Sequence, residues 1–86
     1  MRVYVPVEVA FTATGEMRPR TMTWEDGRKF DIDRVFDIKP SFAMKAGSSG
    51  DRYTVEIRNK RTFLFFEHNP KCGQLTLGRW FIEKEH

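Results

Sequence analysis

The chain has 86 residues, with 15 Lys and Arg against 12 Asp and Glu, and a formal net charge of +3. This length favours a single domain spanning residues 1–86 with one modest core. Because so small a core gives limited stability, association into a homodimer could add to it. The mild positive charge permits contact with DNA or RNA without requiring it.

Cysteine usage and the N-terminal pattern bear on the cellular compartment. The single cysteine, Cys72, rules out an internal disulfide and favours a reducing, cytoplasmic environment. The opening "MRVYVPVEVAF" interrupts its apolar residues with polar ones instead of running a continuous apolar stretch. It therefore predicts neither a signal peptide nor a membrane span.

The first predicted element is a strand over residues 2–12. Its apolar residues recur with the period of two that is typical of a half-buried strand: Val3, Val5, Val7, Val9 and Phe11. Pro6 lies on the opposite phase and cannot donate a backbone hydrogen bond, which predicts an unpaired edge or a bulge at that point.

A hairpin is predicted next, with arms at 18–24 and 28–38 joined by the Asp26-Gly27 turn. The second arm carries an apolar row, and Arg34 shares its phase with Phe30, Ile32, Phe36 and Ile38.

An arginine in an apolar row needs an explanation, because a buried guanidinium without a partner is very costly. Three explanations are open. A bulge at Asp33-Arg34 would turn Val35 inward and Arg34 outward. A buried or rim ion pair would join Arg34 to Glu56 or Glu67. As a third option, Arg34 would bind an anion at the mouth of a barrel.

The rest of the chain predicts a long loop after Pro40 with at most one helical turn near 41–46, and then a second hairpin through "RNKR". The second arm contains "TFLFFEH", a continuous apolar run that suits a strand covered on both faces. A last strand follows, in which Gly78 allows a bulge or a close backbone approach. About six mainly antiparallel strands predict an all-β fold, an SH3-like or OB-like small barrel or meander.

Catalytic and metal-binding patterns are weak in this sequence. His68 and Cys72 supply two potential ligands, whereas structural zinc needs four, and the other histidine is His86. No nucleophile, base and orienting group stand at a recognisable spacing. The sequence therefore predicts no metal, no cofactor and no enzymatic activity.

The stronger pattern combines basic and aromatic residues. Candidate nucleic-acid-binding residues lie at the second hairpin and beside the long loop, together with two tryptophans expected to be partly exposed: Arg52, Arg58, Lys60, Arg61, Lys45, Trp24 and Trp80. Small β domains that bind single strands combine cationic grooves with aromatic platforms. The competing interpretation is that the aromatic residues build the core, with five predicted to face inward: Phe30, Phe36, Tyr53, Phe63 and Phe65.

Several segments also carry a resemblance. "VPVEV", "TWEDGRKFDIDRVFDIKP", "GDRYTVEIRNKRTFLFFE" and "GRWFIE" resemble a group of short uncharacterised bacterial proteins, mostly of Firmicutes. The pattern Trp-x-x-Gly-Arg-x-Phe/Tyr-x-Ile-Asp-Arg-Val is similar to a domain of unknown function encoded near Y-family lesion-bypass DNA polymerases. The resemblance implies a small β domain and a setting in DNA repair or mobile elements, with a DNA-repair protein as a partner.

Two functions are consistent with these patterns. One is a non-enzymatic binding module that contacts nucleic acid or a nucleic-acid enzyme through the Arg58–Arg61 hairpin and the 39–52 loop. The other is a protein-interaction or self-assembly module that uses the Pro6 edge or exposed Trp24 and Trp80.

Overall fold

The computed structural model describes residues 1–41, 49–68 and 77–84. Within these ranges every regular element is a strand, which confirms the all-β prediction; the helical turn predicted near 41–46 falls almost wholly outside the described residues. The strands are β1 (Arg2–Tyr4), β2 (Val7–Phe11), β3 (Met17–Thr23), β4 (Lys29–Asp31), β5 (Arg34–Pro40), β6 (Ser49–Ile57), β7 (Lys60–His68) and β8 (Gly78–Glu83).

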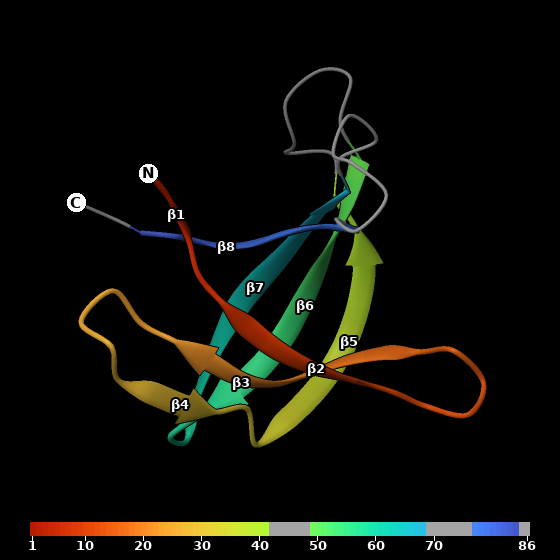
Figure 1. Cartoon of the computed structure of the whole chain (residues 1–86), viewed down its shortest axis with the longest axis horizontal. Helices are drawn as coiled ribbons and strands as arrows, with labels where there is room; N and C mark the ends of the chain where they lie inside the picture. Colours follow the sequence, from red (N-terminus) through yellow and green to blue (C-terminus); the bar gives the residue numbers. More distant parts are fainter. Residues whose placement is uncertain (42–48, 69–76, 85–86) are drawn as a thin grey trace.

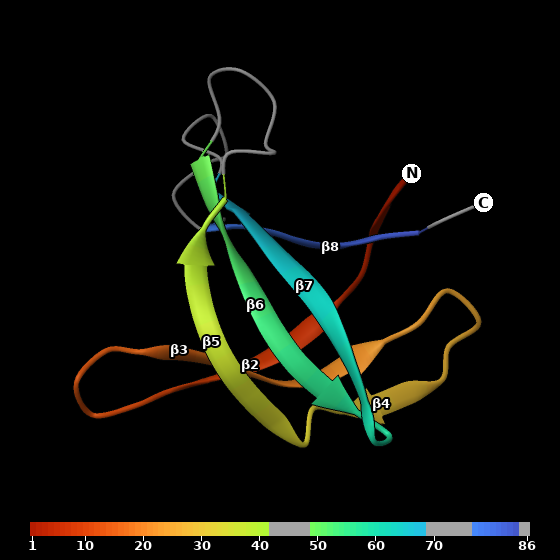
Figure 2. The same ribbon diagram turned by 180° about the vertical axis from the view of Figure 1, so that it is seen from behind.

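The strands form two antiparallel sheets that do not close into a barrel. The larger sheet has the order β1-β8-β7-β6-β5 and the smaller one has the order β2-β3-β4. Figures 1 and 2 show from opposite sides that the smaller sheet runs across the larger one and lies against only one of its faces. No helix among the described residues is long and apolar enough to span a membrane.

The first predicted strand is divided at Pro6, where the chain passes from one sheet to the other. The Val5 amide donates to the Trp80 carbonyl of β8 at 3.0 Å, while the Pro6 carbonyl accepts from the Thr23 amide of β3 at 3.0 Å. Because Pro6 has no amide proton, it fits a position between two ladders. The prediction of a single strand over residues 2–12 is therefore wrong, whereas the predicted interruption at Pro6 is confirmed.

The predicted arm over 28–38 is divided in the same way, which answers the question that Arg34 raised. The Ile32 amide donates to the Arg20 carbonyl in the smaller sheet, and the next amide, of Asp33, donates to the Glu56 carbonyl in the larger sheet. Val35 then packs against the core and Arg34 is exposed, opposite Glu56 in the ladder. The prediction that Arg34 is buried is thus wrong.

The change of phase has a different cause from the predicted bulge at Asp33-Arg34. The chain changes sheet at Ile32-Asp33, and the irregularity in the β5–β6 ladder lies between Val35 and Asp37. That shift leaves Phe36 without a partner in the ladder, and a second bulge-like irregularity lies between Glu8 and Val9 of β2.

The second hairpin is the longest pairing in the molecule and confirms the prediction. Strands β6 and β7 pair from Ser49 opposite His68 to Ile57 opposite Lys60. Arg58 and Asn59 form the two-residue turn with φ of 52° and 65°, the left-handed pair typical of a type I′ turn.

Gly78 marks a close approach in the last strand. A Cβ placed there would meet the Glu67 carbonyl oxygen and would lie 2.7 Å from the Phe66 ring. Only glycine therefore allows β8 to enter the sheet beside β7 without displacing that ring.

The core lies between the two sheets. Its buried members come mainly from the larger sheet, with Met22 contributed by the smaller one: Val5, Met22, Tyr53, Val55, Leu64, Phe66 and Trp80. Trp80 is 8% exposed, and its ring centroid lies 5.0 Å from that of Tyr53 and 4.8 Å from that of Phe66. The expectation that Trp80 is partly exposed is therefore wrong.

Tyr53 places a phenol hydroxyl in this core. Its Oη donates to the Met17 carbonyl at 3.5 Å, which ties the larger sheet to β3. Burial raises the pKa of Tyr53, and the negative charge of Asp51 raises it further. The neutral phenol is therefore the form that the folded protein favours.

Candidate nucleic-acid interface

The larger sheet has a second face, here called the outer face, that the smaller sheet does not cover (Figures 1 and 2). In the ladder, Phe65 lies opposite Phe81, which in turn lies opposite Tyr4. These positions alternate with the core residues Leu64, Phe66 and Trp80 and therefore point away from the smaller sheet. The outer face is thus the side of the sheet on which an external molecule can lie.

Four aromatic rings form a continuous row across β7, β8 and β1 on the outer face. Ring centroids are separated by 6.5 Å for Phe63 and Phe65, by 4.9 Å for Phe65 and Phe81, and by 5.6 Å for Phe81 and Tyr4. Phe65 and Phe81 are nearly parallel, at 4°, and are buried. The two end rings are open, with Phe63 46% and Tyr4 43% exposed.

Arginine side chains, and not a second sheet, cover these rings, with their guanidinium groups over the ring faces. The Cζ atom of Arg2 lies 4.6 Å from the centroid of Phe81, that of Arg79 4.3 Å from Tyr4, and that of Arg52 4.5 Å from Phe63.

At the edge of the same sheet, the Arg61 Cζ lies 4.0 Å from the centroid of Phe36. Planar, weakly hydrated guanidinium groups suit such stacking.

A buried carboxylate fixes the Arg2 and Arg79 end of the row. Glu67 is 4% exposed and accepts hydrogen bonds from Arg2 Nη1 at 3.0 Å and from Arg79 Nη2 at 2.7 Å. The Tyr4 hydroxyl lies 3.4 Å from both carboxylate oxygens. Three donors thus satisfy one buried acid, and β1 is tied to β7 and β8.

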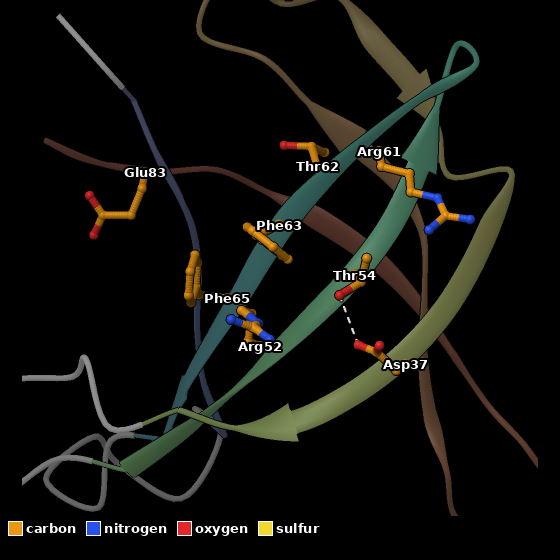
Figure 3. Close-up of a pocket in the computed structure, with 8 residues that line it drawn as sticks. All are labelled: Asp37, Arg52, Thr54, Arg61, Thr62, Phe63, Phe65 and Glu83. Carbon is orange, nitrogen blue, oxygen red and sulfur yellow. Dashed lines mark hydrogen bonds between the residues drawn. The ribbon is translucent and has the colours of Figure 1, made fainter.

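The other end of the row borders a hollow of about 680 Å³, here called the aromatic hollow (Figure 3). Its lining comes from β5, β6, β7 and β8: Asp37, Arg52, Thr54, Arg61, Thr62, Phe63, Phe65 and Glu83. The Thr54 hydroxyl donates to Asp37 at 2.7 Å. Figure 3 shows Arg52 beside Phe65 and Phe63, with Glu83 across the hollow on β8.

The guanidinium group of Arg52 stacks on the Phe63 ring, but its buried nitrogen makes no hydrogen bond. Its Nε atom is buried and has no hydrogen-bond partner. A buried donor left unpaired costs about 1–3 kcal/mol, and a ligand acceptor at Nε would remove that cost. The aromatic hollow therefore holds an arginine with unused donor capacity next to an exposed phenylalanine.

The outer face is more basic than acidic. By ladder position its basic residues are Arg2, Arg34, Lys39, Arg52, Arg61 and Arg79, and its acidic residues are Asp37, Glu56, Glu67 and Glu83. Glu67 and Glu83 together balance Arg2 and Arg79, so the excess of positive charge lies on the β5 and β6 side, where Arg34 and Lys39 add to the arginines of the aromatic hollow.

The structure divides the predicted binding residues into separate groups. Arg52 and Arg61 line the aromatic hollow, while Trp24, Arg58 and Lys60 line a different one between the two sheets. Trp80 belongs to the core, and Lys45 lies outside the described residues.

Sequence reasoning missed the contributions of Tyr4, Phe81, Arg2 and Arg79 to the outer face. The sequence also predicted that Phe63 and Phe65 face inward, whereas both lie on the outer face, where Phe63 is 46% exposed and Phe65 is buried. Tyr53 belongs to the core, and Phe30 and Phe36 are half-buried. The signal was present in "TFLFFEH", since a strand with large apolar residues on both phases needs cover on both faces. Arginine side chains supply part of that cover.

The possible metal ligands do not gather into a site among the described residues. His68 Nε2 lies 3.2 Å from Asp51 Oδ2 on the surface, and residues 1–41, 49–68 and 77–84 contain no group of three or more ligand side chains suited to a metal. Cys72 and His86 lie outside the described residues.

Comparisons with protein-family models, with curated proteins and with solved structures give no match to this chain. The functional argument therefore rests on the geometry of the outer face, and the family resemblance stays a prediction.

Proposed function

We propose that this protein is a non-enzymatic module that binds single-stranded nucleic acid, DNA or RNA, across the outer face of its larger sheet. The observation that carries the proposal is the aromatic row with open ends at Phe63 and Tyr4, flanked by arginines. Bases stack on such rings whatever their sequence, and arginines neutralise the phosphates between them.

The chemistry of the aromatic hollow supports a base and not a phosphate at its centre. Asp37 and Glu83 line the hollow together with Arg52 and Arg61, so a phosphate there would meet carboxylates as well as guanidinium groups. A nucleobase carries both donors and acceptors on its edge and a flat face for Phe63. Arg52 gains a partner for its unpaired Nε if the base replaces it over Phe63.

The predicted setting in DNA repair or mobile elements is compatible with such an activity, because lesion bypass and strand transfer both expose single strands. A module of this kind would hold the strand while a partner enzyme carries out the chemistry.

The test is a fluorescence-anisotropy titration of labelled single-stranded DNA and RNA at about 50 and about 200 mM salt. We expect affinity to fall with salt, because binding releases counterions. Phe63→Ala should weaken binding by about 1–3 kcal/mol, the value of one stacked base.

Phe11→Ala is the matched control, because Phe11 is 59% exposed and lies in the smaller sheet. Likewise, Arg61→Glu should weaken binding more than Arg20→Glu, an equal change of charge at an exposed position outside the larger sheet. Equal effects of Phe63→Ala and Phe11→Ala, or no binding at the lower salt, would contradict the proposal.

A further inference from the structure

A second hollow, of about 340 Å³, lies where the two sheets splay apart beside the β6–β7 turn. Figures 1 and 2 both place β4 next to that turn. The hollow does not belong to the outer face, because its apolar residues lie in or against the core between the sheets. We call it the inter-sheet hollow.

The walls of the inter-sheet hollow are apolar and come from both sheets. The smaller sheet and its hairpin turn contribute Met22, Trp24 and Phe30, and the larger sheet contributes Ile57 and Ile82. Met22 is buried, whereas the other four are only half-buried, so a sizeable apolar surface remains in contact with water. Covering it with an apolar side chain would stabilise a complex by about 25 cal/mol for each Å² removed from water.

The rim of the inter-sheet hollow is basic. Arg28 and Arg58 place their guanidinium Cζ atoms 5.4 and 5.2 Å from the centroid of Phe30, and Lys60 lies beside them. Asp26 balances Arg28 through a contact of 2.6 Å. The side chains of Arg58 and Lys60 form no ion pair with any carboxylate of the described residues, although the Asp33 carboxylate accepts the Arg58 backbone amide at 3.3 Å. With Asp26 counted against Arg28 and Asp33 against Arg58, one positive charge remains in excess at the mouth.

We infer that the inter-sheet hollow binds an acidic peptide segment of a partner protein, with one bulky apolar side chain inserted between the sheets and neighbouring carboxylates on Arg58 and Lys60. Charge complementarity selects an acidic segment. The depth of the hollow favours a side chain over a nucleobase, because a base edge buried against Met22, Ile57 and Ile82 would leave polar groups without partners.

The inference does not depend on nucleic-acid binding, since the two hollows share only Thr62. If both hold, the protein carries a single strand on one side of its larger sheet and a protein partner on the other.

The test uses the indole N–H signals of the two tryptophans in ¹⁵N–¹H correlation spectra, with Trp24→Phe to assign them. The probe is a short synthetic peptide of glutamate and aspartate with one central leucine. We expect saturable shifts of the Trp24 signal, which lines the hollow, and little change of the Trp80 signal, which lies in the core.

Two controls separate the contribution of the rim charge from that of the inserted apolar side chain. Arg58→Glu should weaken peptide binding by about tenfold, whereas Arg20→Glu, with the same change of charge, should leave it unchanged. Replacing the leucine of the peptide by alanine should abolish saturable binding.

Other results would overturn the inference. An unaffected Trp24 signal means that the hollow does not take the peptide, and equal binding of the alanine peptide reduces the effect to charge alone. A larger Trp24 shift with oligothymidine than with the peptide would assign the hollow to nucleic acid, and a shift that grows with protein concentration alone would assign it to a second copy of the chain.

Discussion

At the scale of single residues, Glu67 does most to organise the outer face. It is the one buried charged residue in the described part of the chain, and Arg2, Arg79 and Tyr4 all donate to it. These donors come from β1 and β8, so the carboxylate holds the short first strand in place as well as the rings that the arginines cover. A neutral group at this position would remove the buried negative charge to which both guanidinium groups donate.

We therefore expect Glu67→Gln to lower the free energy of unfolding by about 2 kcal/mol, the loss typical of hydrogen bonds to a charged group. Glu83→Gln is the matched control, because Glu83 also contacts Arg2, at 3.6 Å, but its side chain is 49% exposed. An exposed pair contributes about 1 kcal/mol or less. Urea denaturation measures both variants, and equal losses would show that the buried Glu67 network stabilises the fold no more than an exposed ion pair does.

The prediction for Gly78 is confirmed, whereas those for Trp80, Phe63 and Phe65 are wrong. A glycine inside a strand pattern signals close approach, and the structure has one. Trp80 is followed by Phe81, so one of the two large rings must face the core and the other the outer face. Sequence alternation alone does not show which, because both residues are apolar; the ladder with Phe65 and Phe66 decides it.

At the scale of elements, the β6–β7 hairpin is the frame on which both hollows are built. Its tight turn forces the register that sends Arg52 and Phe63 to the outer face and Ile57 to the inter-sheet hollow. A slip of one residue would exchange the two faces. The turn residues Arg58 and Asn59 therefore determine which side chains line each hollow.

Asn59 gives a direct test of that turn. Its φ of 65° is tolerated by asparagine and glycine but costs other residues about 1–2 kcal/mol. Asn59→Ala should thus lower the free energy of unfolding by about 1 kcal/mol, whereas Asn59→Gly should not lower it. The side chain is exposed, so the backbone conformation is the main difference between the variants. Equal destabilisation by both changes would mean that the turn is not of type I′.

Hairpins were predicted from the sequence, whereas the passage of the chain between sheets was predicted only in part. Asp-Gly and the basic turn have local signals, and both hairpins are present. Pro6 marks one crossing because it lacks a donor. The other crossing, at Ile32-Asp33, keeps the period of two on either side, so the sequence reads as one strand; only long-range hydrogen bonds to Arg20 and Glu56 divide it.

At the scale of the whole molecule, the sheets bury one face against each other and leave their edges poorly suited to pairing. Strands β1 and β4 have three residues each, β2 follows Pro6 and contains an irregularity, and β5 is bulged at Phe36 and ends in Pro40. Short, bulged or proline-bounded edges resist strand addition. Faces and hollows are thus better suited to recognition in this protein than the sheet edges. The Pro6 edge, which was predicted as a contact surface, is among the unsuitable ones.

The two proposed partners would occupy different surfaces. The outer face has stacked rings and arginines, which suit a single strand, whereas the inter-sheet hollow has apolar walls and a basic rim, which suit an acidic segment. The composition shows a basic domain rich in aromatic residues. It does not separate Arg52 and Arg61 from Arg58 and Lys60, because the register of the hairpin must be known before each side chain can be assigned to a face of the sheet.

The most direct test of the central claim is a footprint of bound nucleic acid on the folded protein, measured as backbone amide shifts in ¹⁵N–¹H spectra during titration with a short single-stranded oligonucleotide. If the outer face binds the strand, the largest shifts fall at outward positions of β6, β7 and β8, around Arg52, Phe63 and Phe81. Shifts confined to the Trp24 and Arg58 region, or the absence of saturable shifts at low salt, would contradict it.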